Sequence, residues 1–339
     1  MATSSAAVKK EHHADLTVMD RIDILKNNRF FPLVFPLAML VIIFAFFTIA
    51  TGGEFLKKSV LKGIINQSFI TGTMATAVAF IYTTGNIDFS VGNAMGLACC
   101  LGAMTYSVTN SMAVVVVVTM VMGVVLMLFN CTLCVTFNVK PAMVAIVAMS
   151  IYSAICTVLV GAEPIGVDYN ISKTLEGPFR YISFIAYFGI CLLLYHKTAI
   201  GRKLRFIGGN EKCAIQTGIN AKKTQYISFL FAGVGVGLAG VYQTIRTANV
   251  AATVGTGMGT DVMLATVLGG MSIFGGTKSN CYAGLLGAIT VTMLNKGLLM
   301  MGIPSTSIQL FRGIIFLLLV YLNSDCLLYT SPSPRDRQK

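Results

Sequence analysis

The stretch TTGNIDFSVGNAMG, residues 83–96, separates two long apolar segments with glycines, polar side chains and one carboxylate, Asp88. Of the 339 residues, 55% are hydrophobic and only 11% are charged, and the mean hydropathy is +0.77. A soluble domain carries about 25% charged residues, so this chain has too few to cover a surface that faces water. The composition therefore predicts a membrane protein in which Asp88 lies between two membrane-spanning helices.

Ten segments are long and apolar enough to be membrane-spanning helices, because about 20 predominantly apolar residues cross the hydrocarbon core. They predict an all-α polytopic protein with residues 33–325 as one transmembrane domain. The eighth segment is short and flanked by glycine-rich sequence, so we expect it to be broken or re-entrant. The ten segments are residues 33–50, 64–82, 91–109, 112–137, 142–160, 181–195, 226–245, 258–273, 282–301 and 307–322.

Lysine and arginine are concentrated in two segments, residues 1–32 and residues 196–225. Six predicted spans separate these segments, so both lie on one side of the membrane, and the positive-inside rule makes that side the cytoplasm. The N-terminus is therefore predicted to be cytoplasmic. The formal net charge of +12 is explained by topology signals and by contacts with anionic membrane lipid, and it does not predict a nucleic-acid partner.

The segment 196–225 contains the signals of a short capped helix. Asn210 is a favourable N-cap, Glu211 complements the positive end of a helix, and Gly218 provides a left-handed stop. Gly208 and Gly209 are expected to break the chain before this helix, which we place at residues 211–217. The alternative is an ordinary solvated loop with one capped turn.

Two interpretations of Asp88 remain open. Gly85 and Gly92 open the helix, so Asp88 can accept hydrogen bonds from freed backbone N–H groups, or cap the helix that starts near Ser90. Ionisable groups between membrane spans are functional candidates by default, and discontinuous helices build substrate sites in transporters. The alternative is a structural helix cap at the membrane interface.

Polar and small residues recur within two of the predicted spans. The polar residues of the second span either line a solute path or hold neighbouring helices together; they are Asn66, Gln67, Ser68, Thr71, Thr73 and Thr76. In the seventh span, Gly233, Gly237 and Gly240 are spaced at three and four residues. This spacing predicts close packing against another helix.

Three stretches resemble motifs of one family, the inner-membrane permeases of bacterial ABC importers for ribose and related simple sugars. GNIDFSVGNAMGLACCLGAM resembles that family's G-G-I-D-L-S-V-G stretch, with Asn86 in place of the second glycine and Phe89 in place of the leucine. FIGGNEKCAIQTGINAKKTQ resembles its cytoplasmic G-G-N-E loop, and MLATVLGGMSIFGGTKSNCYAGLLGAI resembles its A-x-V-L-G-G-x-S-x-F-G-G stretch, where Asp261 is the preceding acidic residue.

The resemblance implies a homodimeric, ten-span permease of the bacterial inner membrane with a solute path between or within subunits. It also implies an ATPase partner inside and a solute-binding protein outside. On these grounds the candidate path residues are Asn66, Thr71, Asn86, Asp88 and Ser90. The candidate residues for coupling to the ATPase are Gly209, Asn210, Glu211, Ala214 and Gly218.

The chain itself is not predicted to be an enzyme. It has no G-x-x-x-x-G-K-[ST] phosphate loop, so ATP and Mg²⁺ are expected on the partner, and no cofactor or metal is expected here. The motifs favour import of a simple sugar or a sugar-like solute such as a nucleoside. The alternatives are an ion-coupled secondary transporter and a branched-chain amino acid permease of related architecture.

The last residues do not continue the pattern of a membrane protein. After the tenth span, CLLYTSPSPRDRQK, residues 326–339, resembles translated sequencing-adapter DNA. We therefore expect residues 326–339 to be non-native and to contribute nothing to the fold.

Overall fold

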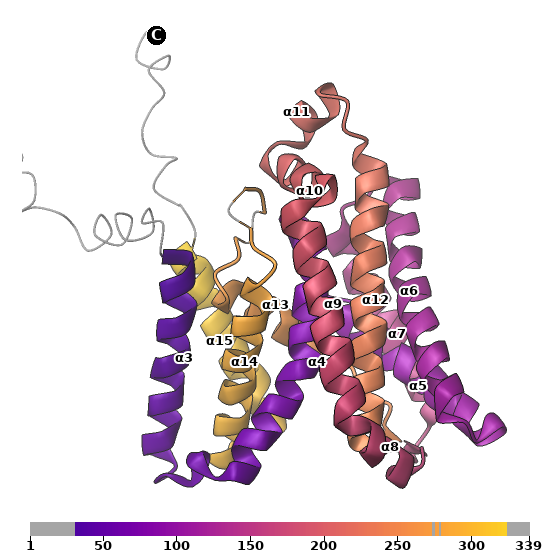
Figure 1. Ribbon diagram of the computed structural model, residues 1–339, viewed down its shortest axis with the longest axis vertical. Helices are drawn as coiled ribbons and strands as arrows, with labels where there is room; N and C mark the ends of the chain where they lie inside the picture. The colour runs from indigo at the N-terminus through magenta and orange to yellow at the C-terminus, as the bar shows by residue number, and fades with distance from the viewer. Residues whose placement is uncertain (1–30, 273–274, 278, 324–339) are drawn as a thin grey trace, which may run out of the picture.

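The computed structural model describes residues 31–272, 275–277 and 279–323 (Figure 1). The predicted segment 1–32 lies almost entirely outside these residues, and the predicted tail 326–339 lies wholly outside them. Within the described residues all regular secondary structure is helical apart from one pair of two-residue strands. The prediction of an all-α polytopic protein is confirmed.

The helices follow one another through the described chain with short connections. The first half contains α3 (Phe31–Ala50), the short 3₁₀ helix η1 (Glu54–Leu56), α4 (Lys58–Thr83), α5 (Val91–Thr109), α6 (Met112–Phe137) and α7 (Pro141–Val160). The second half contains β1 (Ile165–Gly166), α8 (Tyr169–Glu176), α9 (Pro178–Lys197), α10 (Ala199–Gly209), α11 (Glu211–Gln216), α12 (Ala221–Thr247), β2 (Asn249–Val250), α13 (Met258–Leu268), α14 (Ala283–Met300) and α15 (Ser305–Asn323).

Each of the ten predicted spans corresponds to one of these helices. Seven described helices are long and apolar enough to cross a membrane, and shorter apolar helices lie within α3, α13 and α15. Two long helices begin earlier than predicted, α4 at Lys58 and α12 at Ala221, because lysine side chains can reach water from a helix end that projects from the hydrocarbon. The eighth span, α13, has only 11 residues, about 16 Å, and Gly269 and Gly270 follow it.

Two sets of helices repeat the same packing. In the first set α4 is followed by a break, α5, α6 and α7; in the second set α12 is followed by a break, α13, α14 and α15. The contacts of α4 with α14, of α5 with α6 and of α5 with α7 recur as α12 with α6, α13 with α14 and α13 with α15. Since successive spans alternate in direction, the two sets run in opposite senses, which is the inverted-repeat architecture of many transporters.

The centre of the bundle is formed by α4 and α12, whose side chains are mostly buried, whereas α7 and α9 are mostly exposed at the periphery (Figure 1). α12 packs closely on α6. A Cβ at Gly237 would overlap the backbone of Met120, and a Cβ at Gly233 would overlap the backbone of Val124. A Cβ at Gly240 would lie 2.9 Å from the Thr119 side chain of α6 and 3.2 Å from Sγ of Cys99 in α5. The predicted packing role of these three glycines is confirmed.

The short strands β1 and β2 pair in antiparallel fashion, with Ile165 opposite Val250 and Gly166 opposite Asn249. This pair ties the connection after α7 to the end of α12, at the opposite end of the molecule from α11 (Figure 1). From this point the chain enters the second break and reaches the first residue of α13. The strand pair therefore helps to fix where the second broken helix begins.

Candidate functional site

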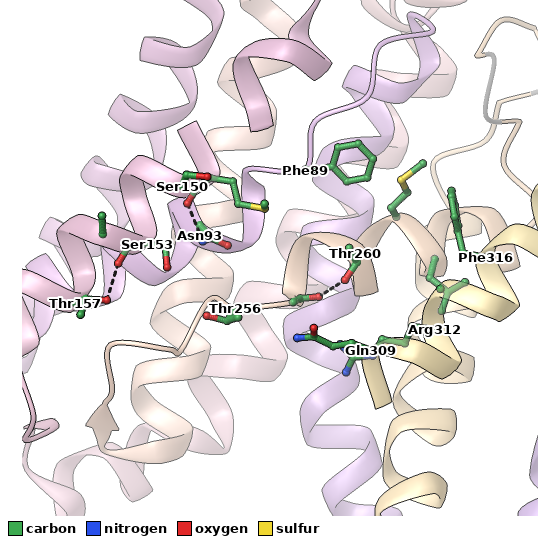
Figure 2. A pocket seen from close by; sticks show the side chains of 16 residues that line it. Phe89, Asn93, Ser150, Ser153, Thr157, Thr256, Thr260, Gln309, Arg312 and Phe316 are labelled. Carbon is green, nitrogen blue, oxygen red and sulfur yellow. Dashed lines mark hydrogen bonds between the residues drawn. The ribbon is translucent and has the colours of Figure 1, made fainter. Parts of the chain in front are cut away.

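A cavity of about 710 Å³ lies where α5, α7, α13 and α15 come together (Figure 2). Its wall alternates apolar side chains with hydroxyl, amide and guanidinium groups. The polar residues that line it are Asn93, Ser150, Ser153, Thr157, Thr256, Thr260, Gln309 and Arg312. Phe89 and Phe316 contribute aromatic rings to the lining. Since α5 corresponds to α13 and α7 to α15, the cavity is formed by equivalent elements of the two helix sets.

The two broken helices meet beside this cavity with their N-terminal ends close together. A Cβ at Gly92, in the first turn of α5, would overlap the backbone of Gly259, in the first turn of α13. Gly259 in turn approaches the carbonyl of Phe89. Glycine is therefore required here because any side chain would push the two helix starts apart. Discontinuous helices that meet in this way are a recurring device for building solute sites.

Three hydroxyl groups of the lining donate their hydrogens to their own helices. Ser150 Oγ donates to the carbonyl of Ile146 at 3.3 Å, and Thr157 Oγ1 donates to the carbonyl of Ser153 at 3.0 Å. Thr260 Oγ1 donates to the carbonyl of Gly257 at 2.7 Å. A hydroxyl has one hydrogen and two lone pairs, so these oxygens remain available as acceptors.

Arg312 contributes the only charged side chain of the described lining. Its Nε lies 2.9 Å from Oδ1 of Asp261 and donates to Oδ1 of Asn295 at 3.0 Å. Asn295 Nδ2 donates to the other oxygen of Asp261 at 3.2 Å. These contacts join α13, α14 and α15, and the arginine and aspartate side chains are only 16% and 11% exposed. A charge so far from water requires a partner, and Asp261 provides it.

Sequence reasoning did not select Arg312 as a site residue. The available signal was a single arginine inside the apolar segment 307–322, because ionisable residues within membrane spans are functional candidates. Asp261 was recognised only as the acidic residue before the third motif. Because 50 positions separate the two residues, the sequence alone does not predict that they form an ion pair.

Asp88 lies in the break between α4 and α5 and is almost fully buried. Its Oδ1 accepts hydrogen bonds from the backbone nitrogen of Ser90 at 2.8 Å and from the Ser90 hydroxyl at 2.6 Å. Asn130 Nδ2 donates to the Ser90 hydroxyl at 2.8 Å, and Tyr152 donates to Asn130 Oδ1 at 2.7 Å. A hydrogen-bonded chain thus runs from the first break through α6 to α7, which lines the cavity.

The five predicted path residues fall into two groups. Asn86, Asp88 and Ser90 all lie in the first break, and Asn86 Nδ2 donates to Thr84 Oγ1 at 3.0 Å. Asp88 and Ser90 flank Phe89, which lines the cavity, but none of the five is itself among the described lining residues. A role of these residues in the solute path stays a prediction.

Asn66 and Thr71 lie away from the break, on α4. Asn66 Nδ2 donates to Glu176 Oε1 at 3.1 Å, and the same oxygen accepts from Arg180 Nη1 at 3.1 Å. Thr71 is buried among the helices. Elsewhere in the same stripe, Ser68 and Thr73 donate to carbonyls of α4 itself. These contacts favour the packing interpretation of the polar stripe.

The predicted capped helix is present as α11. Asn210 Oδ1 accepts from the backbone nitrogen of Cys213 at 3.1 Å, and Gly218 has a φ of +84°. Both predicted capping features are confirmed, and the helix ends at Gln216, one residue before the predicted end. Glu211 is exposed in the first turn, whereas Ala214 is buried. The role of α11 in coupling to an ATPase stays a prediction.

The expectation that Gly208 and Gly209 break the chain is wrong, because both residues belong to α10. A Cβ at Gly208 would overlap the carbonyl oxygen of Thr83 and the backbone of Gly276. Gly208 is therefore explained by close packing against the last residue of α4. Nothing in the described structure approaches the Cβ position of Gly209 within 4 Å.

The end of α4 is fixed by further contacts where α10 abuts it. Gly276 donates its backbone N–H to Thr83 O at 2.9 Å. Tyr195 Oη lies 2.8 Å from Thr83 Oγ1 and donates to the carbonyl of Ser279 at 2.8 Å. α10 is thus in direct contact with the segment that leads into the first break, α11 packs on α10, and both project from one end of the bundle (Figure 1).

The family model described as branched-chain amino acid transport system / permease component matches residues 60–321. The chain is 26% identical to the ribose import permease protein of Escherichia coli K12 over 299 residues, which cover 85% of this chain and 92% of that protein. No solved structure matches the chain.

Two further relatives have similar coverage. The ribose import permease protein of Bacillus subtilis 168 is 29% identical over 278 residues, covering 80% of this chain and 86% of that protein. The xylose transport system permease protein of Haemophilus influenzae Rd is 25% identical over 359 aligned positions, covering 85% of this chain and 95% of that protein.

Proposed function

The chain belongs to the family of branched-chain amino acid transport system permease components, and on that premise we propose that it is the permease subunit of an ATP-binding cassette importer for a simple sugar or sugar-like solute. It is a transport component and not an enzyme. The observation that supports this proposal most strongly is the cavity of about 710 Å³ at the meeting point of the two broken helices, where hydroxyl, amide and guanidinium groups lie among apolar side chains.

The lining of the cavity supports an uncharged, hydrogen-bonding solute. Hydroxyl and amide groups dominate its polar surface, and the one charged side chain, Arg312, is paired with Asp261 within the described structure. A branched-chain amino acid would present a charged ammonium and a charged carboxylate, and the described lining offers no unpaired charge to bind either of them. The names of the ribose and xylose relatives point in the same direction.

The two ends of the bundle are proposed to bind different partners. α10 and α11, with their basic flanking residues, would contact the ATPase, which binds ATP and Mg²⁺. A solute-binding protein would dock at the opposite end, where α8 and the strand pair lie. The N-terminus and α11 would then be cytoplasmic, in the bacterial inner membrane, in accordance with the positive-inside rule.

The permease is further proposed to act as a homodimer with its peripheral helices in contact with lipid. α7 and α15 expose large apolar side chains beside the cavity, among them Ile151, Ile155 and Ile314. Burial of these faces against a second copy would enclose the cavity at the subunit interface. In a monomer the same side chains would face the hydrocarbon of the membrane.

Uptake into proteoliposomes tests the proposal. The full permease, reconstituted with the ATPase and the solute-binding protein of the same importer, should accumulate labelled D-ribose only when hydrolysable ATP is supplied on the ATPase side. The control replaces ATP with a non-hydrolysable analogue. Accumulation of leucine in place of D-ribose would support the amino acid alternative.

An ion-coupled secondary transporter is the second candidate, because Asp88 and Asp261 are carboxylates within the bundle. Such a carrier would lose uptake when a protonophore and a sodium ionophore collapse the ion gradients, and it would need no ATPase. Uptake that persists under these conditions and depends on ATP would exclude it.

A further inference from the structure

The terminal nitrogens of Arg312 do not hold the described fold together through hydrogen bonds. Among the described residues its guanidinium makes polar contacts only through Nε, toward Asp261 and Asn295. Nη1 and Nη2 therefore have no hydrogen-bond partner in the described structure, although the side chain lines the cavity (Figure 2). A guanidinium is a rigid fork of donors, so fixing Nε also fixes the direction of both Nη groups.

The space around these nitrogens is kept open by glycine. A Cβ at Gly257 would lie 3.2 Å from Nη1 of Arg312 and 3.5 Å from the amide nitrogen of Gln309. Gly257 also has a φ of +78°, which side chains other than glycine rarely adopt. Gln309 and Arg312 lie three positions apart on α15 and so share one face of the helix. Together they present hydrogen-bond donors to the cavity.

A neighbouring carboxylate neutralises the positive charge of Arg312. Asp261 lies in the first turn of α13, so its carboxylate offsets both the guanidinium and the positive end of that helix. The wall is therefore close to neutral, and a solute has little net charge to bind. What the wall offers is a set of oriented donors.

The opposite part of the lining has the complementary pattern. Ser150 and Thr157 on α7 have already donated their hydroxyl hydrogens to their own helix, so their oxygens are left as acceptors. A solute that spans the cavity must accept hydrogen bonds beside Arg312 and donate them beside α7. A polyhydroxy compound does both, whereas an ionised carboxylate only accepts hydrogen bonds.

We propose that Arg312 is a specificity-determining residue of the cavity, and that its two terminal nitrogens bind neighbouring hydroxyl oxygens of an uncharged polyhydroxy solute. This assignment rests on the proposed function of the cavity as a solute path. Asp261 and Asn295 act as positioning residues, because they hold the guanidinium through Nε and do not themselves line the cavity.

Arginine modification tests the assignment without a transport assay. The full chain in lipid nanodiscs is treated with phenylglyoxal, an uncharged reagent that condenses with the Nη nitrogens of arginine, and each arginine is followed by peptide mass spectrometry. Arg202 is exposed and reports on reagent activity, whereas Arg180 is buried and pairs with Glu176. Arg312 should react more slowly than the exposed Arg202 but several-fold faster than Arg180.

Protection then identifies the chemistry of the solute. D-ribose should slow the modification of Arg312 several-fold and leave that of Arg202 unchanged. Leucine and inorganic phosphate should give no protection. The assignment is overturned if Arg312 reacts as slowly as Arg180, if D-ribose gives no protection, or if leucine or phosphate protects in its place.

Uptake by the reconstituted importer provides the second test and separates the two proposals. Arg312→Lys keeps a positive charge for Asp261 but loses the paired nitrogens, so it should raise KM for D-ribose several-fold with little change in kcat. The double variant Arg312→Gln/Asp261→Asn removes both charges together and controls for folding. An unchanged KM in both variants contradicts the assignment, whereas absence of ATP-driven uptake by the unmodified protein contradicts the proposed function.

Discussion

Asp88 Oδ1 accepts both the backbone N–H and the hydroxyl of Ser90, at 2.8 Å and 2.6 Å. The two contacts close the first break into a fixed turn directly before α5. Ser90 continues the chain of hydrogen bonds to Asn130 and Tyr152, so the shape of the break is linked to α7. The carboxylate is thus used as a backbone acceptor.

Replacing Asp88 separates this acceptor role from charge chemistry. Asp88→Asn keeps one acceptor oxygen, whereas Asp88→Leu leaves the buried donors of Ser90 unpaired, at about 1–3 kcal/mol. We expect the asparagine variant to retain more transport and a higher thermal unfolding midpoint than the leucine variant. Equal and complete loss of transport in both, with normal membrane insertion, would instead indicate charge chemistry and favour an ion-coupled carrier.

Removal of the Tyr152 hydroxyl should loosen the far end of the same hydrogen-bonded chain. Tyr152→Phe deletes the donor to Asn130, and the expected loss of stability is about 1 kcal/mol. Tyr106→Phe is the matched control, because the Tyr106 hydroxyl has no hydrogen bond within the described structure. Thermal unfolding measured in detergent should show a lower midpoint for Tyr152→Phe only. Equal midpoints would show that this series of hydrogen bonds contributes nothing to stability.

The caps of α11 should matter for association with an ATPase. Asn210→Ala removes about 1 kcal/mol of local helix stability, and Gly218→Val opposes the left-handed stop. We expect the double variant to insert normally but to recover less ATPase on co-purification. Asn220→Ala is the control, because Asn220 caps α12 with the same geometry. If the double variant co-purifies with the ATPase and transports as well as the unmodified protein, α11 is only a solvated connector.

Two neighbouring glycines offer a sharper test of the contact between α10 and α4. Gly208→Ala would push a methyl group into the Thr83 carbonyl, whereas Gly209→Ala meets nothing within 4 Å in the described structure. Alanine favours helix over glycine by about 1 kcal/mol, so Gly209→Ala should be neutral or stabilising. We expect Gly208→Ala to reduce transport per ATP hydrolysed. Identical transport and ATPase rates in both variants would contradict a mechanical link through this contact.

Local signals in the sequence predicted the helices well. A helix lies at each of the ten segments that hydropathy predicted, because each apolar segment needs only its own composition to be recognised. The caps of α11 were equally readable, since Asn210 and Gly218 act on residues within four positions. The small-residue spacing of α12 also predicted its close packing, although not that α6 would be the neighbour.

The cavity could not be predicted in the same way. Asp261, Asn295 and Arg312 come together only after three helices pack, and no local pattern connects them. Polar residues on α4 were ambiguous because a serine or threonine hydroxyl can donate to its own helix, as Ser68 and Thr73 do. Gly208 was misread for a related reason: glycine weakens a helix in isolation, but here close contact with Thr83 requires it.

Blocking the cavity chemically tests the central claim most directly. Ser153 lines the cavity, and Ser153→Cys can be modified with a bulky maleimide in a background with Cys213→Ser and Cys326→Ser, since Cys213 is exposed and the other described cysteines are buried. Ser107→Cys, near the end of α5 and outside the cavity lining, is the control. We predict that ATP-driven D-ribose uptake is lost after modification at position 153 and is kept after modification at position 107. Undiminished uptake with complete modification at position 153 would contradict the cavity as the solute path.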